Sequence, residues 1–179
     1  MELFSKYKAA ALADVALGDC IVLRYSLGQD KGYRHTVAIK IARGEDERDA
    51  VGGMSAVIAL WSEEGSPPFT PTLMDLRNVV EVLEIPGAGA QLSSNPAHMF
   101  WTSDPPVGAL YLFGGEPHIL VEDGMFPASL ISVRLTNGAR GRAPKGSVPW
   151  FPFWTVAVPD TKGRMETICS INLRKQRLL

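Results

Sequence analysis

The stretch that decides the fold is CIVLRYSL-GQDKG-YRHTVAIKIAR, which runs from residue 20 to residue 43. In residues 20–27 and again in residues 33–43, apolar side chains recur at every second position. A period of two is typical of half-buried β-strands, because successive side chains point to opposite faces. The intervening residues 28–32 have the composition of a turn. These residues therefore predict a β-hairpin.

Alternating or β-branched segments recur along most of the chain. We count nine of them, separated by turns that draw on 17 Gly and 13 Pro. Many short strands with regular turn signals are typical of small barrels and sandwiches. The sequence therefore predicts a mainly β protein with minor α structure, built as small β-barrel or β-sandwich units. The helical part is a short N-terminal helix over residues 2–13, where Leu3, Tyr7 and Ala10 recur at helical spacing before Gly18.

Residues 73–85 carry two competing signals. Leu76, Val80 and Leu83 have helical spacing after a potential cap at Thr72, whereas the β-branched side chains favour a strand. We expect a helical turn that gives way to a strand by Val79.

The organisation into domains is predicted from residues 86–107, which are rich in Pro, Gly and Ser and lack periodicity. We interpret them as an irregular linker between a barrel-like N-terminal unit, residues 1–85, and a C-terminal β unit, residues 108–179. A single domain is the alternative.

The cysteines and the hydropathy pattern bear on the cellular setting. Cys20 and Cys169 have no Cys-x-x-Cys partner, and each lies in a predicted strand, where a free thiol behaves as a small buried apolar group. This favours a reducing, cytoplasmic compartment. No apolar run approaches the ~18 residues that a membrane-spanning helix needs, so we expect no membrane partner.

The net charge of −1 hides a strong asymmetry. Residues 1–123 hold 9 Lys and Arg against 17 Asp and Glu, whereas residues 124–179 hold 9 against 2. No acidic residue occurs between Asp123 and Asp160. A basic region of this kind is able to bind an anionic partner, or it packs against the acidic part of the same protein.

The most unusual segment combines these basic residues with aromatic ones. A Gly- and Arg-rich arm, residues 137–147, leads into PWFPFW at residues 149–154. Such an arm could bind single-stranded nucleic acid, since bases stack on aromatic faces, or dock a protein through hot-spot residues. It could equally be a core strand with its prolines at an edge. The candidate binding residues are Arg140, Arg142, Lys145, Trp150, Phe151 and Trp154.

Catalytic and metal signatures are weak. His35 shares a face with Val37 and Ile39, so it is either a hydrogen-bonded rim histidine or a pocket residue. His98, Glu116 and His118 would form a metal site only if separate loops converged, because the compact spacing of zinc motifs is missing. The Ser55 region does not match Gly-x-Ser-x-Gly. We expect no metal and no cofactor.

The sequence therefore favours a non-enzymatic protein-interaction or assembly module that acts within an oligomer or a larger complex. A nucleic-acid-binding protein that uses the basic, aromatic C-terminal third is the alternative. An enzyme with a pocket around His35 is the second alternative.

Overall fold

The fold is described from a computed structural model of the chain. It covers residues 7–26, 32–42, 54–62, 71–76, 79–92, 99–102, 105–122, 130–160 and 162–173. Apart from one 3-10 turn, η2 (Leu12–Asp14), the elements in these ranges are strands. They are β1 (Lys8–Ala10), β2 (Cys20–Ser26), β3 (Tyr33–Lys40), β4 (Met54–Ser62), β5 (Thr72–Asp75), β6 (Val79–Glu84), β7 (Gly89–Leu92), β8 (Phe100–Thr102), β9 (Leu110–Phe113), β10 (Glu116–Glu122), β11 (Leu130–Arg134), β12 (Arg140–Arg142), β13 (Val148–Phe151), β14 (Phe153–Pro159) and β15 (Met165–Asn172).

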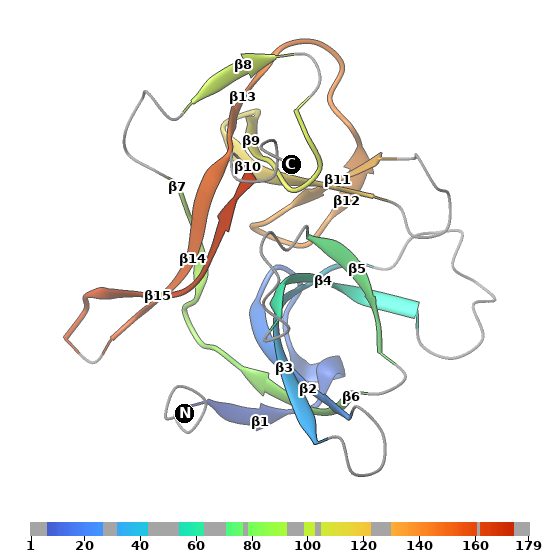
Figure 1. Ribbon diagram of the computed structural model, residues 1–179, viewed down its shortest axis with the longest axis vertical. Helices are drawn as coiled ribbons and strands as arrows, with labels where there is room; N and C mark the ends of the chain where they lie inside the picture. Colours follow the sequence, from blue (N-terminus) through green and yellow to red (C-terminus); the bar gives the residue numbers. More distant parts are fainter. Residues whose placement is uncertain are drawn as a thin grey trace.

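The strands form two sheets. The 12-stranded sheet follows the order β1-β6-β2-β3-β4-β5-β10-β9-β13-β8, with β11 beside β10 and β12 beside β11, and the three-stranded sheet follows β15-β14-β7. In Figure 1, β1 to β6 lie at the lower end of the long axis and β8 to β13 at the upper end. β14 and β15 lie at the left, beside these two groups of strands. The prediction of a mainly β protein is confirmed. The barrel is not closed, because the path of described strands ends at β1 on one side and β8 on the other.

The hairpin predicted from residues 20–43 is β2 and β3, which pair antiparallel from Cys20 opposite Ile39 to Ser26 opposite Tyr33. Its first four residues are buried on both faces rather than on one. Cys20 and Val22 face the larger hydrophobic cluster, whereas Ile21 and Leu23 face a smaller one. The hairpin therefore lies between two apolar layers.

The predicted helix over residues 2–13 is wrong for the part that the structure describes. Lys8–Ala10 is β1, paired antiparallel with β6, and a single 3-10 turn follows. A short helix is costly to nucleate, whereas β6 offers unpaired backbone groups beside β1. The Lys40 ammonium then holds the turn, since it donates to the carbonyl oxygens of Leu12 at 2.7 Å, Ala13 at 3.2 Å and Val15 at 2.5 Å.

Residues 73–85 resolve in favour of strands. The expected helical turn is wrong, because Thr72–Asp75 is β5, whereas the expected strand from Val79 is found as β6. The pairing of β6 with both β1 and β2 satisfies its backbone groups and outweighs the helical spacing.

The proposed linker, residues 86–107, is not irregular throughout. It contains β7, which pairs with β14, and β8, which pairs with β13. One hydrophobic cluster also joins side chains of both halves, among them Val22, Ile39, Tyr111 and Trp154. The division into two domains stays a prediction. In the described ranges, no helix is long and apolar enough to cross a membrane.

The two halves meet at a backbone crossing between two glycines. Gly18 N donates to Lys40 O at 2.8 Å, and Ala42 N donates to Gly138 O at 2.9 Å. Gly138 has φ +65°, and a Cβ there would lie 2.8 Å from Lys40 O. Gly18 has φ +92°, and a Cβ there would lie 2.9 Å from Leu135 O. Only glycine allows both the backbone conformation and this approach.

Gly138→Ala should therefore destabilise the protein more than Gly146→Ala. Both glycines have positive φ, which costs a residue with a Cβ about 1–2 kcal/mol, but only Gly138 also meets backbone atoms. Chemical denaturation of both variants measures the difference in the free energy of unfolding. Equal losses in the two variants would contradict the crossing.

The cysteines are both buried and unpaired, as expected from the sequence. Burial raises the pKa of each thiol to about 12. A neighbouring Cys169 and Asp19 add to the shift at Cys20, whereas a backbone hydrogen bond with Val156 opposes it at Cys169.

Neither thiol should react with Ellman's reagent in the native protein at mildly alkaline pH, because the thiolate is the reactive form and is scarce. Two thiols should react at once after the chain is unfolded in guanidinium. Rapid labelling of either cysteine under native conditions would show that the thiol is accessible.

Candidate functional site

The site is built on a tight hairpin between β9 and β10. Gly114 and Gly115 have φ of 60° and 82°, the conformation of a two-residue type I′ turn. The loop is only two residues long, since Glu116 already pairs with Phe113. This register places Tyr111 opposite His118, and β11 places Arg134 on the other side of His118.

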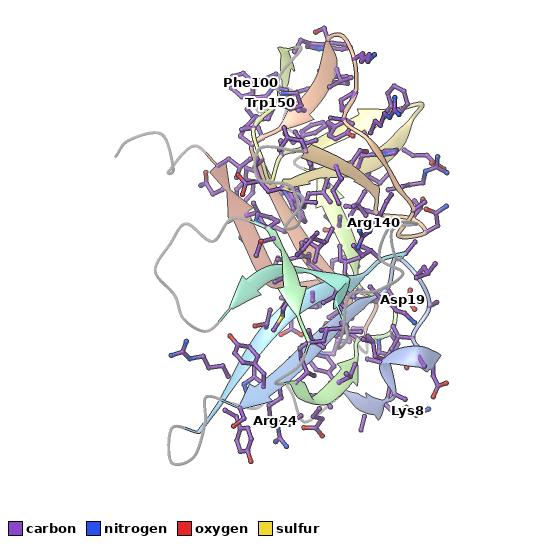
Figure 2. The ribbon with its side chains drawn as sticks, turned by 90° about the vertical axis from the view of Figure 1, so that its right-hand side faces the viewer. Lys8, Asp19, Arg24, Phe100, Arg140 and Trp150 are labelled. Carbon is purple, nitrogen blue, oxygen red and sulfur yellow. The ribbon has the colours of Figure 1, made fainter. Side chains whose placement is uncertain are left out.

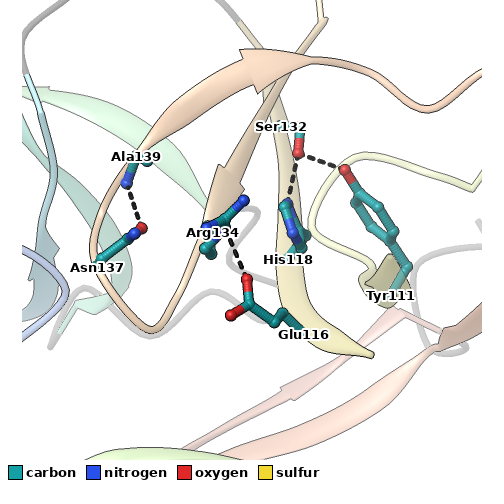
Figure 3. Close-up of polar contacts among 7 residues, drawn as sticks. All are labelled: Tyr111, Glu116, His118, Ser132, Arg134, Asn137 and Ala139. Atoms are coloured by element: carbon teal, nitrogen blue, oxygen red, sulfur yellow. Dashed lines mark hydrogen bonds and ion pairs between the residues drawn. The ribbon is translucent and has the colours of Figure 1, made fainter. Parts of the chain in front are cut away.

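A chain of buried hydrogen bonds links the three strands (Figure 3). Tyr111 donates its hydroxyl hydrogen to Ser132 Oγ, which lies 2.9 Å from His118 Nδ1. In one tautomer of neutral His118, Nδ1 accepts the hydroxyl hydrogen of Ser132 and the proton of the ring is on Nε2. In this tautomer every hydroxyl of the chain donates to the next group.

The environment of His118 favours this neutral form. The side chain is 7% exposed, stacks on the Tyr111 ring at 5.4 Å between centroids, and meets the Phe113 ring edge-on at 6.0 Å. Burial lowers the His118 pKa, Arg134 lowers it further, and Glu116 opposes them. Burial raises the pKa of Tyr111, against the effect of its bond to Ser132, so its hydroxyl stays a donor.

His118 Nε2 is buried and has no hydrogen-bond partner among the described residues. A buried donor or acceptor without a partner costs on the order of 1–3 kcal/mol. Such a group is often explained by a function or by a ligand that completes it.

His118 lines a cavity of about 300 Å³ between β9, β10, β11, β12 and the segment that follows β12. Four basic residues line it, Arg134, Arg140, Arg142 and Lys145, and none of the described residues that line it is acidic. Glu116, beside the cavity, holds Arg134 through an ion pair of 2.8 Å between Oε2 and Nε. The cavity is therefore suited to an anion.

The turn before β12 gives these basic residues their positions. Asn137 Oδ1 accepts a hydrogen bond from Ala139 N at 3.0 Å (Figure 3). Arg134 N donates to Ala139 O at 2.9 Å. β12 then pairs with β11, with Gly141 opposite Ser132. Part of the Gly- and Arg-rich arm is thus a strand, not a free loop.

The structure divides the six candidate binding residues into two groups. Arg140, Arg142 and Lys145 line the cavity together. Trp150 and Phe151 on β13 and Trp154 on β14 are at most 6% exposed and belong to the core. Trp154 Nε1 donates to Gly108 O at 3.1 Å, and the Trp150 ring packs on the Phe100 ring with 5.3 Å between centroids. Figure 2 shows Trp150 and Phe100 at the opposite end of the molecule from Arg24 and Lys8. This placement matches the core interpretation of the aromatic residues.

The other histidines lie elsewhere. His35 is on β3 opposite Arg24 and does not line this cavity. His98, which with Glu116 and His118 was considered for a metal, lies outside the described residues. Within the part of the chain that the structure describes, no three His, Cys, Asp or Glu side chains are grouped as metal ligands.

The 2.9 Å distance between Ser132 Oγ and His118 Nδ1 is also that of a catalytic serine and its general base, but the surroundings of the two residues differ from those of a catalytic triad. In a catalytic triad, a third group holds the second nitrogen of the histidine, and the hydroxyl faces substrate. Here the second nitrogen has no partner among the described residues, and Ser132 is 4% exposed and already accepts from Tyr111. The geometry favours a binding role over a role for Ser132 as a nucleophile. We call Tyr111, His118 and Ser132 the floor of the cavity.

Sequence reasoning missed the floor, and it missed exposed aromatic residues. Tyr111, His118 and Ser132 come from three strands, and only the exact register brings them together. The length of the Gly114–Gly115 loop was the available signal. Trp101 on β8 is 64% exposed, although its sequence context gave no indication of this.

The pKa of His118 in the native protein should lie below the usual value of about 6.5. The unfolded chain then binds more protons between the two pKa values, so the free energy of unfolding should fall as the pH drops through about 6.5. Nuclear magnetic resonance titration of the imidazole gives the first quantity, and denaturation at several pH values gives the second. In His118→Phe this part of the pH dependence should disappear. A native pKa above 6.5 would contradict the buried neutral form.

No protein-family model, curated protein or solved structure matches this chain.

Proposed function

We propose that the protein is a non-enzymatic binding module that docks an acidic segment of a partner protein, within a larger assembly. The observation that carries the proposal is the cavity lined by Arg134, Arg140, Arg142 and Lys145, with no acidic residue in the part of its lining that the structure describes. Arginine is well suited to such a site, because its planar fork binds carboxylates and phosphates with two parallel hydrogen bonds.

A protein partner is favoured over nucleic acid by the position of the aromatic residues. Binding of single strands depends on aromatic faces that are open to the bases. Trp150, Phe151 and Trp154 are buried, so they are not available for stacking. Phe113 is the exposed aromatic residue that lines the cavity, and one ring beside four basic side chains is also typical of a protein interface.

The same proposal places the protein in the cytoplasm. Two buried, unpaired thiols are consistent with a reducing compartment, where disulfides are rare. The acidic balance of residues 1–123 also makes a second copy of the chain one partner of suitable charge.

Binding of a short Glu- and Asp-rich peptide should be weakened by Arg142→Gln combined with Lys145→Gln. Both residues are exposed at the cavity, and each exposed charge accounts for up to about 1 kcal/mol, so the affinity should fall roughly three- to tenfold. Lys162→Gln combined with Arg164→Gln is the matched control, because both residues are exposed in the segment between β14 and β15 and do not line the cavity.

Fluorescence anisotropy at two salt concentrations measures these affinities for the peptide and for a single-stranded oligonucleotide. Equal effects of the two double variants would show that only net charge matters. Tighter binding of the oligonucleotide, with a steep log-linear dependence on salt, would replace the proposal with nucleic-acid binding. Sedimentation of the protein alone reports whether a second copy is the partner.

A further inference from the structure

The starting observation is the hydrogen-bond chain at the floor of the cavity. Tyr111 donates to Ser132, and Ser132 Oγ lies 2.9 Å from His118 Nδ1. His118 Nε2 is buried and has no partner among the described residues. In the tautomer in which Ser132 donates to Nδ1, the floor ends in a neutral Nε2–H that lacks an acceptor.

The second observation is the charge around this donor. Arg134 on β11 and Arg140 and Arg142 on β12 line the cavity. Lys145, in the segment that follows β12, also lines it. Glu116 compensates Arg134 through their ion pair, and the exposed charges of Arg142 and Lys145 leave the described lining of the cavity with an excess of positive charge. An ionised carboxylate carries one negative charge and about four acceptor positions. A phosphate monoester carries nearly two charges and three acceptor oxygens, and it matches the excess better.

The third observation is size. A cavity of about 300 Å³ is at the lower limit of small-molecule sites, which span ~300–1,000 Å³. It has room for one side-chain-sized group rather than for a length of extended chain. A single phosphorylated side chain meets this limit.

We propose that the floor of the cavity is a subsite for a phosphate monoester dianion, carried by a phosphorylated serine or threonine of the partner, with His118 Nε2–H as its neutral donor and Arg142 and Lys145 as its charged ones. This inference rests on the proposed function, because it assigns the deepest part of the same site. No covalent step is involved, and the phosphate is bound and released unchanged.

Binding requires a small side-chain movement. Nε2 is covered in the free protein, and Phe113 is the neighbour with room to move, since its ring is 56% exposed and packs edge-on against the imidazole. Phe113 rotates aside and His118 Nε2 then meets a phosphate oxygen. The cationic rim is already open to solvent at Arg142 and Lys145.

Inorganic phosphate, sulfate and acetate are the probes, added to the intact ¹⁵N-labelled protein at constant ionic strength. Sulfate is included because it stays doubly charged at neutral and mildly acidic pH, which separates titration of the ligand from titration of His118. Phosphate and sulfate should shift the His118 ring resonances saturably, and acetate should do so at least tenfold more weakly. Equal shifts with acetate would overturn the dianion, and no shift with any of the three would overturn the subsite.

Two variants separate the roles of the donors. His118→Phe keeps an aromatic ring at this position but removes Nε2–H. Phosphate affinity should then fall about tenfold, the usual loss for one hydrogen bond to a charged group. Arg142→Gln is the second variant, because this residue is exposed and its replacement does not disturb the core; it should also weaken phosphate binding. Unchanged phosphate affinity in both variants, with folding verified by circular dichroism, would reject the assignment.

The source of the phosphate is tested by competition. A phosphoserine peptide should displace sulfate at lower concentration than the same peptide with Glu in place of phosphoserine. A 5′-phosphorylated oligonucleotide that displaces sulfate better than the phosphopeptide would overturn the assignment to a protein partner. The outcomes are distinguishable. Binding of acidic peptides without any phosphate shift at His118 rejects the subsite and leaves the proposed function. A phosphate shift without binding of any peptide rejects the proposed function and the protein source of the phosphate, and leaves only an anion site.

Discussion

The close backbone approach of Gly18 and Gly138 is the constraint on which the arrangement of the two halves depends. The turn after β11 lies against the end of β3, where Ala42 N donates to Gly138 O and Gly18 N donates to Lys40 O. Neither glycine has space for a Cβ, and each has a φ that other residues rarely adopt. Hydrogen bonds between backbone atoms at such short range tolerate little displacement, so they hold the turn in one position relative to the N-terminal strands.

That fixed turn determines where the basic residues lie. The chain leaves Gly138 through Ala139, whose carbonyl accepts from Arg134 N, and enters β12 directly. Arg140 and Arg142 are therefore positioned by a paired strand, whereas Lys145 lies on the segment that follows it. A site whose charged residues come from a strand loses less conformational entropy on binding than one built on a free loop. The buried chain from Tyr111 to His118 adds a rigid floor below them.

The sequence was sufficient where a local pattern and the final environment agree. The alternation in residues 20–43 predicted the hairpin of β2 and β3, and the structure contains it. Local spacing failed near Lys8–Ala10, because the pairing of β1 with β6 decided the outcome, and this long-range contact has no local signal. Segment 149–154 was ambiguous for another reason: large aromatic side chains have the same composition in a core as at an interface. The contact between Ser132 and His118 could not be predicted from the sequence, since it depends on the register of β10 and β11.

The two-residue loop at Gly114–Gly115 has a consequence for how this protein can diverge in evolution. It sets the pairing of β9 with β10, and through it the position of Tyr111 opposite His118. One inserted residue would force either a bulge or a slip by one position, and a slip turns every side chain of β10 to the opposite face. Replacing either glycine keeps the loop length but requires a residue with a Cβ to adopt positive φ. Among homologues, this loop should therefore keep its length more strictly than the exposed segment between β14 and β15, where additional residues would leave both strands in place.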